Sequence, residues 1–252
     1  MLLSPRNEHG LVRWIINLII LGVIVVVAAP FVYFKFIQGD APKPLSLETT
    51  PTVTTVPGGA RLPLAGTWKI TTGSTAGYRA KEKLFAQSNT AVGRTTKVTG
   101  AMTIAGAKVT TAAFTVDMTS VASVGNKIDS ALINQRDGYF QGRIMNTAQF
   151  PTSKFVLTSP IALAPVPKDG VSKSYSATGK LTLHGTTKTV TIPITARRTS
   201  NVIQLQGNLS LTFSDYGISD PSGGPASVGK VGQLEFVLQL AKTTGTSAVA
   251  PG

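Results

Sequence analysis

The chain has 252 residues, enough for one large β domain or two small domains, and it contains no cysteine. The missing cysteines exclude disulfides, thiolate metal sites, a cysteine nucleophile and a lipid-modified N-terminal cysteine. With 24 Lys and Arg against 11 Asp and Glu, the formal net charge is +13, and most of the excess lies beyond residue 40. Such a basic chain is attracted to anionic partners, among them nucleic acid, anionic lipid and acidic polymers.

The first apolar stretch runs from Trp14 to Phe34, and Asn17 is its only strongly polar residue. About 20 residues in a helix cover the hydrocarbon thickness of a bilayer, and aromatic residues such as Trp14 and Tyr33 favour its interfaces. A cleaved signal peptide has a shorter apolar region. The pattern therefore predicts an uncleaved transmembrane anchor over residues 14–37.

Charges around this segment predict its orientation. Arg6 and Arg13 precede it and Lys35 follows it, so the positive-inside rule favours a cytoplasmic N-terminus over residues 1–13. The rest of the chain is then extracytoplasmic, at the cell membrane, which disfavours nucleic acid as a partner.

Three further regions follow the predicted anchor. Residues 38–63 are rich in Pro, Thr, Gly and Ser, which predicts a tether that would reach roughly 80 Å in polyproline form. Residues 64–242 form one folded domain without an internal repeat. Residues 243–252 are predicted to be a disordered tail.

Within the folded domain, Gly and Pro punctuation and period-two alternation favour an all-β structure. The clearest pattern is the hairpin Lys180–Ala196, in which Pro193 cannot donate to a ladder and so predicts a free edge or a bulge. A bulge is also expected near Gly100. The other expected strands are Gly66–Ile70, Tyr78–Phe85, Lys97–Ile104, Thr111–Thr119, Ser153–Ser159, Asn201–Phe213 and Gln233–Leu240.

One stretch, residues 123–149, lacks strand periodicity. Ile128, Leu132 and Ile133 lie about one helical turn apart, which predicts one or two short helices, broken near Gly138 and Gly142. This insertion is expected to act as a lid or plug.

The residues that catalysis or metal binding would need are scarce. His184 is the only histidine in the domain, because His9 precedes the predicted anchor, and a hydrogen-bonded turn residue is the simpler reading of it. Asp137 next to Arg136 is typical of a salt bridge or a cap rather than of a pair with Asp129. No phosphate loop, HExxH helix or dinucleotide fingerprint is present, so we expect no enzyme, no metal site and no cofactor.

Several motifs resemble the YceI-like, polyisoprenoid-binding family. Gly179–Lys188 resembles the family's hallmark hairpin, Gly66–Ile70 its opening strand, and Phe150–Phe155 its Pro-Thr-x-x-Phe segment. Arg136–Asp137 resembles its Arg-Asp pair and Phe213–Ile218 its late loop. The sequence departs from the family in the insertion, where Met145–Gln149 replaces the usual Phe-Phe-Asp.

The resemblance implies an extended, antiparallel, lipocalin-like β-barrel with a short helical insertion and a long apolar tunnel. Periodicity alone favours a filled barrel, because every barrel has such inward-facing residues. The residues expected to line the tunnel are Phe114, Val116, Met118, Phe140, Ile144, Phe155, Leu157, Leu181, Leu183, Ile192, Ile194, Leu209, Leu211, Phe213, Phe236 and Leu238. If the ligand has a phosphate head group, the candidate partners are Arg136, Arg143, Lys180 and Lys188.

The resulting hypothesis is a membrane-anchored, extracytoplasmic protein that holds an isoprenoid or other amphiphilic lipid, as a carrier or reservoir. The alternative is a cell-envelope or stress-related module that binds anionic polymers through a basic barrel surface and carries no lipid. The sequence leaves the oligomeric state open.

Overall fold

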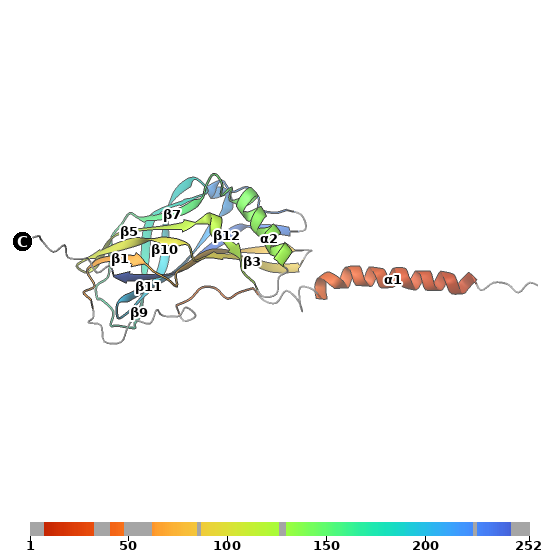
Figure 1. The fold of residues 1–252 in the computed structure, drawn as a ribbon, viewed down its shortest axis with the longest axis horizontal. Helices are drawn as coiled ribbons and strands as arrows, with labels where there is room; N and C mark the ends of the chain where they lie inside the picture. Colours follow the sequence, from red (N-terminus) through yellow and green to blue (C-terminus); the bar gives the residue numbers. More distant parts are fainter. Residues whose placement is uncertain are drawn as a thin grey trace, which may run out of the picture.

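The computed structural model describes residues 8–32, 41–47, 62–84, 87–125, 130–223 and 226–242. Its main unit is an antiparallel sheet that curls into a barrel (Figure 1). The strands are β1 (Gly66–Ile70), β2 (Thr75–Leu84), β3 (Gln87–Thr95), β4 (Val98–Ala105), β5 (Lys108–Asp117), β6 (Ala122–Ser123), β7 (Thr152–Leu157), β8 (Ile161–Ala162), β9 (Ser172–Leu183), β10 (Thr186–Thr199), β11 (Val202–Thr212) and β12 (Ala226–Lys242). The helical elements in and around the barrel are η2 (Met118–Ser120), α2 (Ser130–Tyr139), η3 (Phe140–Ile144) and η4 (Phe213–Tyr216).

The sheet closes because the last strand returns to the first. Eight strands follow one another in the order β1-β4-β5-β7-β9-β10-β11-β12, and β12 pairs with β1, with Ile70 opposite Leu240. The earlier part of β12 pairs with β2, which continues the sheet into β3 and β6. The predicted all-β antiparallel barrel with a short helical insertion is confirmed.

The barrel interior contains two apolar clusters, one toward each end. At one end, here called the Trp68 end, the indole of Trp68 is fully buried and its Nε1 donates to the Leu64 carbonyl at 2.9 Å. At the other, here called the α2 end, Phe140 and Met145 of the helical insertion pack against the inner side chains of β9 and β11. The insertion therefore closes the α2 end with apolar side chains.

Several boundaries differ from those predicted. The irregularity in the β4–β5 ladder lies between Thr103 and Ile104 rather than at Gly100, which instead adopts φ +138° opposite Phe114. The insertion is not broken at Gly138 or Gly142, because α2 runs directly into η3, a π-helical turn in which Met145 N–H donates to the Phe140 carbonyl. Strands β3, β6 and β8 were not predicted. Ile128 and Asp129 lie outside the described residues.

The β9–β10 hairpin has the predicted turn. His184 and Gly185 both adopt left-handed conformations, with φ of +48° and +74°, which is the geometry of a tight hairpin turn. The His184 Nδ1 lies 3.2 Å from the Tyr216 carbonyl oxygen, so its predicted role as a hydrogen-bonded turn residue is confirmed. Pro193 lies where one edge of β10 is free, because pairing with β11 begins at Ile194.

The N-terminal helix α1 (Glu8–Val32) is drawn apart from the barrel (Figure 1). Among the residues that the structure describes, no helix combines the length and the apolar character needed to cross a membrane. The last residues of the predicted anchor, 33–37, and the predicted tail, 243–252, lie outside the described residues.

Part of the predicted tether, residues 41–47, lies against the outer wall of the barrel. Leu45 N–H donates to Oε2 of Glu235 at 3.1 Å, and the same carboxylate pairs with Arg94 at 2.8 Å. Further along, Arg197 donates to the carbonyl of Leu47, whose side chain is buried. This segment explains why Glu235 is buried although it lies on the outer side of β12.

Candidate functional site

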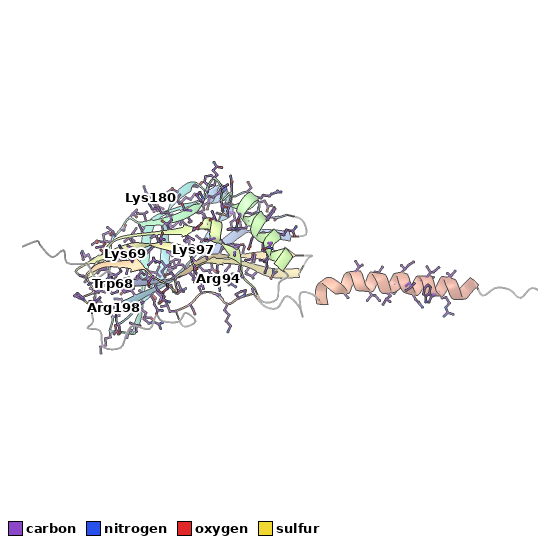
Figure 2. All side chains as sticks on the ribbon, viewed as in Figure 1. Trp68, Lys69, Arg94, Lys97, Lys180 and Arg198 are labelled. Carbon is purple, nitrogen blue, oxygen red and sulfur yellow. The ribbon has the colours of Figure 1, made fainter. Side chains whose placement is uncertain are left out.

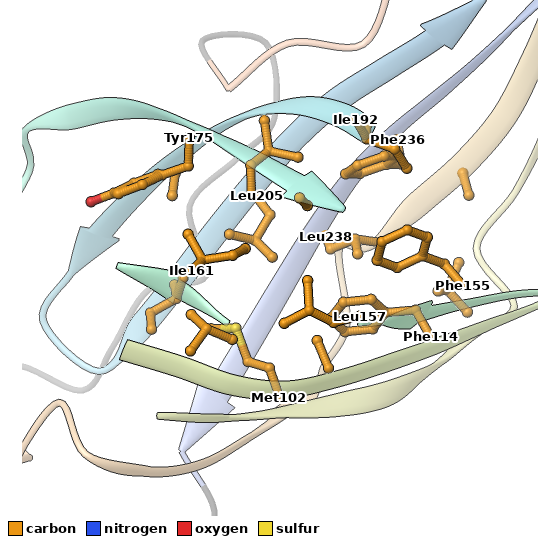
Figure 3. Close-up of a pocket in the computed structure, with 18 of the residues that line it drawn as sticks. Met102, Phe114, Phe155, Leu157, Ile161, Tyr175, Ile192, Leu205, Phe236 and Leu238 are labelled. Atoms are coloured by element: carbon orange, nitrogen blue, oxygen red, sulfur yellow. The ribbon is translucent and has the colours of Figure 1, made fainter. Parts of the chain in front are cut away.

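The barrel encloses a cavity of about 220 Å³ (Figure 3). Its wall consists of the inward-facing residues of alternating strands, such as Leu205 on β11 and Leu238 on β12. An inward residue recurs at every second position, which is the alternation of a sheet with one face toward a core. The wall is almost wholly apolar, so the cavity suits a hydrocarbon chain and not a polar metabolite.

Aromatic side chains in the barrel lie next to glycines on the adjacent strand. A Cβ on Gly207 would lie 2.5 Å from the ring of Phe236, and one on Gly93 would lie 2.3 Å from the ring of Tyr78. Phe155 is similarly close to Gly179. Because no side chain separates these rings from the backbone, the rings lie on the barrel wall instead of filling the centre.

Stacked rings and a buried ion pair close the α2 end. Phe140 of η3 stacks on Tyr78 of β2, with ring centroids 4.8 Å apart and an interplanar angle of 11°. Above them, Arg136 of α2 contacts buried Glu82 at 2.5 Å, and Asn89 donates to the same Glu82 oxygen at 2.6 Å. Burial raises the pKa of Tyr78 well above its ordinary value, and the nearby positive charge of Arg136 only partly offsets this shift.

The cavity reaches the surface at the Trp68 end, beside the loop that joins β8 to β9. Val166, Lys168 and Val171 of this loop line it together with Tyr175 of β9 and Arg198 of β10. Val166 and Val171 are 48% and 50% exposed, so this part of the wall faces solvent. Figure 3 shows Tyr175 at the opposite side of the cavity from Phe155 and Phe114.

Most of the residues predicted to line a tunnel lie on the cavity wall; their role in ligand binding stays a prediction. On the wall are Phe114, Val116, Met118, Phe155, Leu157, Leu181, Leu183, Ile192, Ile194, Leu209, Phe236 and Leu238. The other four, Phe140, Ile144, Leu211 and Phe213, pack in the cluster at the α2 end. They close the cavity there instead of extending it.

The four candidate head-group cations do not line the cavity. Arg136 pairs with Glu82, and Lys188 pairs with Asp215 at 3.2 Å. The Arg143 guanidinium lies 5.5 Å from the centre of the Tyr139 ring. Lys180 is exposed on the outer side of β9 (Figure 2).

Sequence reasoning missed the residues at the open end. Val166, Lys168 and Val171 belong to a Pro-punctuated loop with no periodicity, and Arg198 lies beyond the end of the predicted hairpin. The sequence of β10 does contain a signal for Arg198. Ile192, Ile194, Ala196 and Arg198 occupy every second position of this strand and therefore lie on the same face, which lines the cavity. Among the described residues, no group of three metal-ligating side chains is present.

A closed antiparallel barrel around an apolar cavity defines a lipocalin-like class of binding proteins. A family model described as the YceI-like domain matches residues 68–240, which is more than half of the chain. The chain therefore belongs to the YceI-like domain family, and the resemblance seen in its motifs is confirmed. No curated protein matches it.

Solved structures are similar to this chain at low sequence identity. A polyisoprenoid-binding domain from Saccharophagus degradans, implicated in plant cell wall breakdown, is 17% identical with a TM-score of 0.54, covering 71% of this chain and 99% of that domain. BcnA from Burkholderia cenocepacia is 23% identical with a TM-score of 0.48, covering 66% of this chain and 95% of its own. The YceI protein of Campylobacter jejuni is 11% identical with a TM-score of 0.41, covering 80% and 98%. At 17% identity, the likeness to the Saccharophagus degradans domain extends to the fold alone.

Proposed function

We propose that the barrel holds an isoprenoid or a similar single-chain amphiphile non-covalently, as a carrier or reservoir, and catalyses no reaction. The observation that carries this proposal is the apolar cavity, whose aromatic rings lie on glycines and leave its centre free. Membership in the YceI-like family supports it, as does the polyisoprenoid-binding domain that shares the fold.

The size of the cavity limits the chain that fits without rearrangement. An engineered cavity of about 150 Å³ binds one benzene molecule, which corresponds to about 25 Å³ of cavity volume for each carbon atom. By the same ratio, the cavity of about 220 Å³ accommodates about nine carbons, close to two isoprene units. A longer chain either extends through the open end or displaces the Tyr78–Phe140 stack.

The bilayer, rather than water, is the relevant reference for the affinity. Transfer from water stabilises each buried CH₂ by about 0.8 kcal/mol, but a lipid in a membrane is already in an apolar medium. Extraction from the bilayer therefore depends on shape fit and on contacts with the head group.

Lipid analysis of the full chain tests this function. The protein is purified from cells, exchanged into a non-ionic amphipol and extracted with organic solvent, and its extract is compared by mass spectrometry with that of an unrelated membrane-associated protein purified in parallel. We expect one class of single-chain lipid to be enriched near one equivalent. An extract identical to that of the control would contradict the proposal.

We also propose single-pass membrane attachment through Trp14–Phe34, with the N-terminus cytoplasmic and the barrel extracytoplasmic. The apolar sequence supports this, as does the exposure of the side chains of Trp14, Ile19 and Val26, which are 63%, 60% and 73% exposed. A helix that is apolar on all sides is typical of a buried or membrane environment. Resistance to carbonate extraction, with barrel epitopes accessible from outside the cell, is the expected result; release by carbonate would refute attachment.

If the helix is an anchor, the barrel lies close to the bilayer. Only residues 35–40 separate Phe34 from the segment that packs on Arg94 and Glu235, and an extended chain advances at most about 3.5 Å per residue. The attachment point of the barrel is then within about 25 Å of the anchor. This distance is much shorter than the roughly 80 Å that a free tether over residues 38–63 would reach.

A further inference from the structure

The open end of the cavity combines an apolar wall with positive charge. Lys168 and Arg198 line it, and Lys173 projects from the start of β9 next to them, with its Nζ 5.3 Å from the Tyr175 ring centre. The exposed side chains of Val166 and Val171 flank these cations. Figure 2 shows Arg198 next to Trp68, at the barrel end away from α2.

Among the described residues, the side chain of Lys173 contacts neutral groups. Lys173 Nζ donates to the carbonyls of Ala164 and Pro165 at 3.4 and 3.0 Å. Arg198 donates to the carbonyls of Ser200 and Leu62, and its guanidinium lies 5.2 Å from the centre of the Trp68 ring. Within the described part of the chain, the Lys168 ammonium has no ion pair or hydrogen bond. Carbonyl and aromatic partners orient the Lys173 ammonium without cancelling its charge.

Apart from Asp169, the described acidic side chains of the barrel lie away from this mouth. Asp169 is the one described carboxylate in this loop, and both of its oxygens accept from Ser200 N–H, at 3.1 and 3.0 Å. Glu235 is engaged on the outer wall by Arg94 and Leu45. The remaining described acids of the barrel domain belong to the half that contains α2, η2 and η4, and they are Glu82, Asp117, Asp137, Asp215 and Asp220.

We propose that this mouth, formed by Lys168, Lys173, Tyr175 and Arg198, binds the phosphate head group of an amphiphile whose chain fills the cavity. The proposal rests on the proposed lipid-binding function and adds the chemistry and position of the head group. Ammonium, guanidinium and phenol groups supply several donors for phosphate oxygens, and charge-assisted hydrogen bonds to phosphate are strong. The apolar wall begins directly behind these donors, so head and chain occupy one continuous site.

Calorimetric titration of the full chain in a non-ionic amphipol tests this site with three probes. Geranyl phosphate carries the charge and a ten-carbon chain, geraniol carries the same chain without the charge, and inorganic phosphate carries the charge alone. We expect geranyl phosphate to bind about 10-fold or more tightly than geraniol, because one charged hydrogen bond accounts for about that factor. Inorganic phosphate should bind far more weakly than either, and 0.5 M salt should reduce the preference for the phosphate.

Variants locate the effect. Lys168→Gln should weaken geranyl phosphate about 10-fold and leave geraniol unchanged, and Lys168→Arg should restore the affinity. Arg198→Gln should also weaken geranyl phosphate binding, but it removes contacts to Leu62 and Trp68 as well. If the Arg198 variant does not fold, the Lys168 variants test the head-group site. Lys180→Gln, on the outer wall, is the matched control and should change neither affinity.

The outcomes separate the two proposals. If geraniol binds as tightly as geranyl phosphate, lipid binding stands and the head-group site is refuted. If inorganic phosphate binds as tightly as geranyl phosphate, or if Lys180→Gln weakens binding as much as Lys168→Gln, the site is likewise refuted. If neither ten-carbon probe binds, the lipid-binding function itself fails.

Discussion

Filling the cavity from its wall should abolish lipid binding without unfolding the barrel. Ala177 of β9 lines the cavity and is buried, opposite Ile192 of β10. Ala177→Phe adds six ring carbons, which at about 25 Å³ each occupy about 150 Å³ of the cavity. About two thirds of the free volume of about 220 Å³ is then lost.

The loss of volume converts into a loss of affinity. Six ligand carbons that can no longer be buried correspond to about 5 kcal/mol relative to water, at about 0.8 kcal/mol each. Geraniol titrated from water into the full chain should therefore bind more than about 1,000-fold more weakly to Ala177→Phe than to the wild type. Water is the appropriate reference in this assay, because the probe starts in solution.

Stability provides the control for this prediction. The added ring enters free space, so the midpoint of thermal unfolding should not fall. Ser176→Phe places the same ring at an exposed position on the outer side of the same strand, and it should bind geraniol like the wild type. Wild-type affinity in a folded Ala177→Phe variant would refute the account of the cavity.

Three further predictions concern the closed end and the wall. Arg136→Ala leaves Glu82 buried without its cation and should lower the free energy of unfolding by roughly 3 kcal/mol in denaturant titrations. Burial raises the pKa of Tyr78, so the unfolded chain loses this proton first as the pH rises. The stability associated with Tyr78 is present below about pH 10 and should fall above it, and Tyr78→Phe should flatten that dependence in unfolding measurements between pH 9 and 11. Gly207→Ala places a Cβ 2.5 Å from the Phe236 ring and should cost about 1–3 kcal/mol of stability while weakening geraniol binding, as the ring moves into the cavity.

Paired variants distinguish these effects from general damage. The double variant Glu82→Gln/Arg136→Met removes both charges and should recover part of the stability lost in Arg136→Ala. Equal destabilisation in the single and double variants would contradict the ion-pair explanation. Gly106→Ala, in a turn with φ +57° and nothing within 4 Å of an added Cβ, should strain the backbone but leave geraniol binding unchanged.

Strand alternation predicted the all-β structure and most of the inward-facing residues of the wall, and the resemblance to the YceI-like family implied the barrel around them. In β9 and β10, apolar residues occupy every second position because one face lines the cavity and the other meets solvent. The pattern fails in β3, where Val92 points outward and is nevertheless only 1% exposed. Its burial depends on what covers the outer face, which the local sequence does not encode.

The packing of residues 41–47 could not be predicted for a related reason. Composition alone suggests a free tether, since Pro and Thr offer little to bury. The contact of Leu45 with Glu235 joins residues that are 190 positions apart. Such a contact follows from the closure of the barrel and not from local periodicity.

The open and closed ends of the cavity also depend on tertiary structure. Leu211 and Phe213 continue the inward alternation of β11, yet they pack beneath the helical insertion instead of extending the cavity. Lys168 lies in a loop without periodicity that leads into β9. The ladder of β9 and β10 places Tyr175 next to Ile194 and ends near Arg198, and Lys168 therefore lines the same end of the cavity. Strand register therefore determines which cations meet the cavity.

Native mass spectrometry of the full chain, purified from cells and exchanged into a non-ionic amphipol, tests the central claim most directly. The wild type and Ser176→Phe should each carry one non-covalent lipid adduct, released at moderate collision energy, and Ala177→Phe should carry none. A wild-type chain without an adduct, or an equal adduct on Ala177→Phe, would contradict the conclusion that this barrel holds a lipid in its cavity.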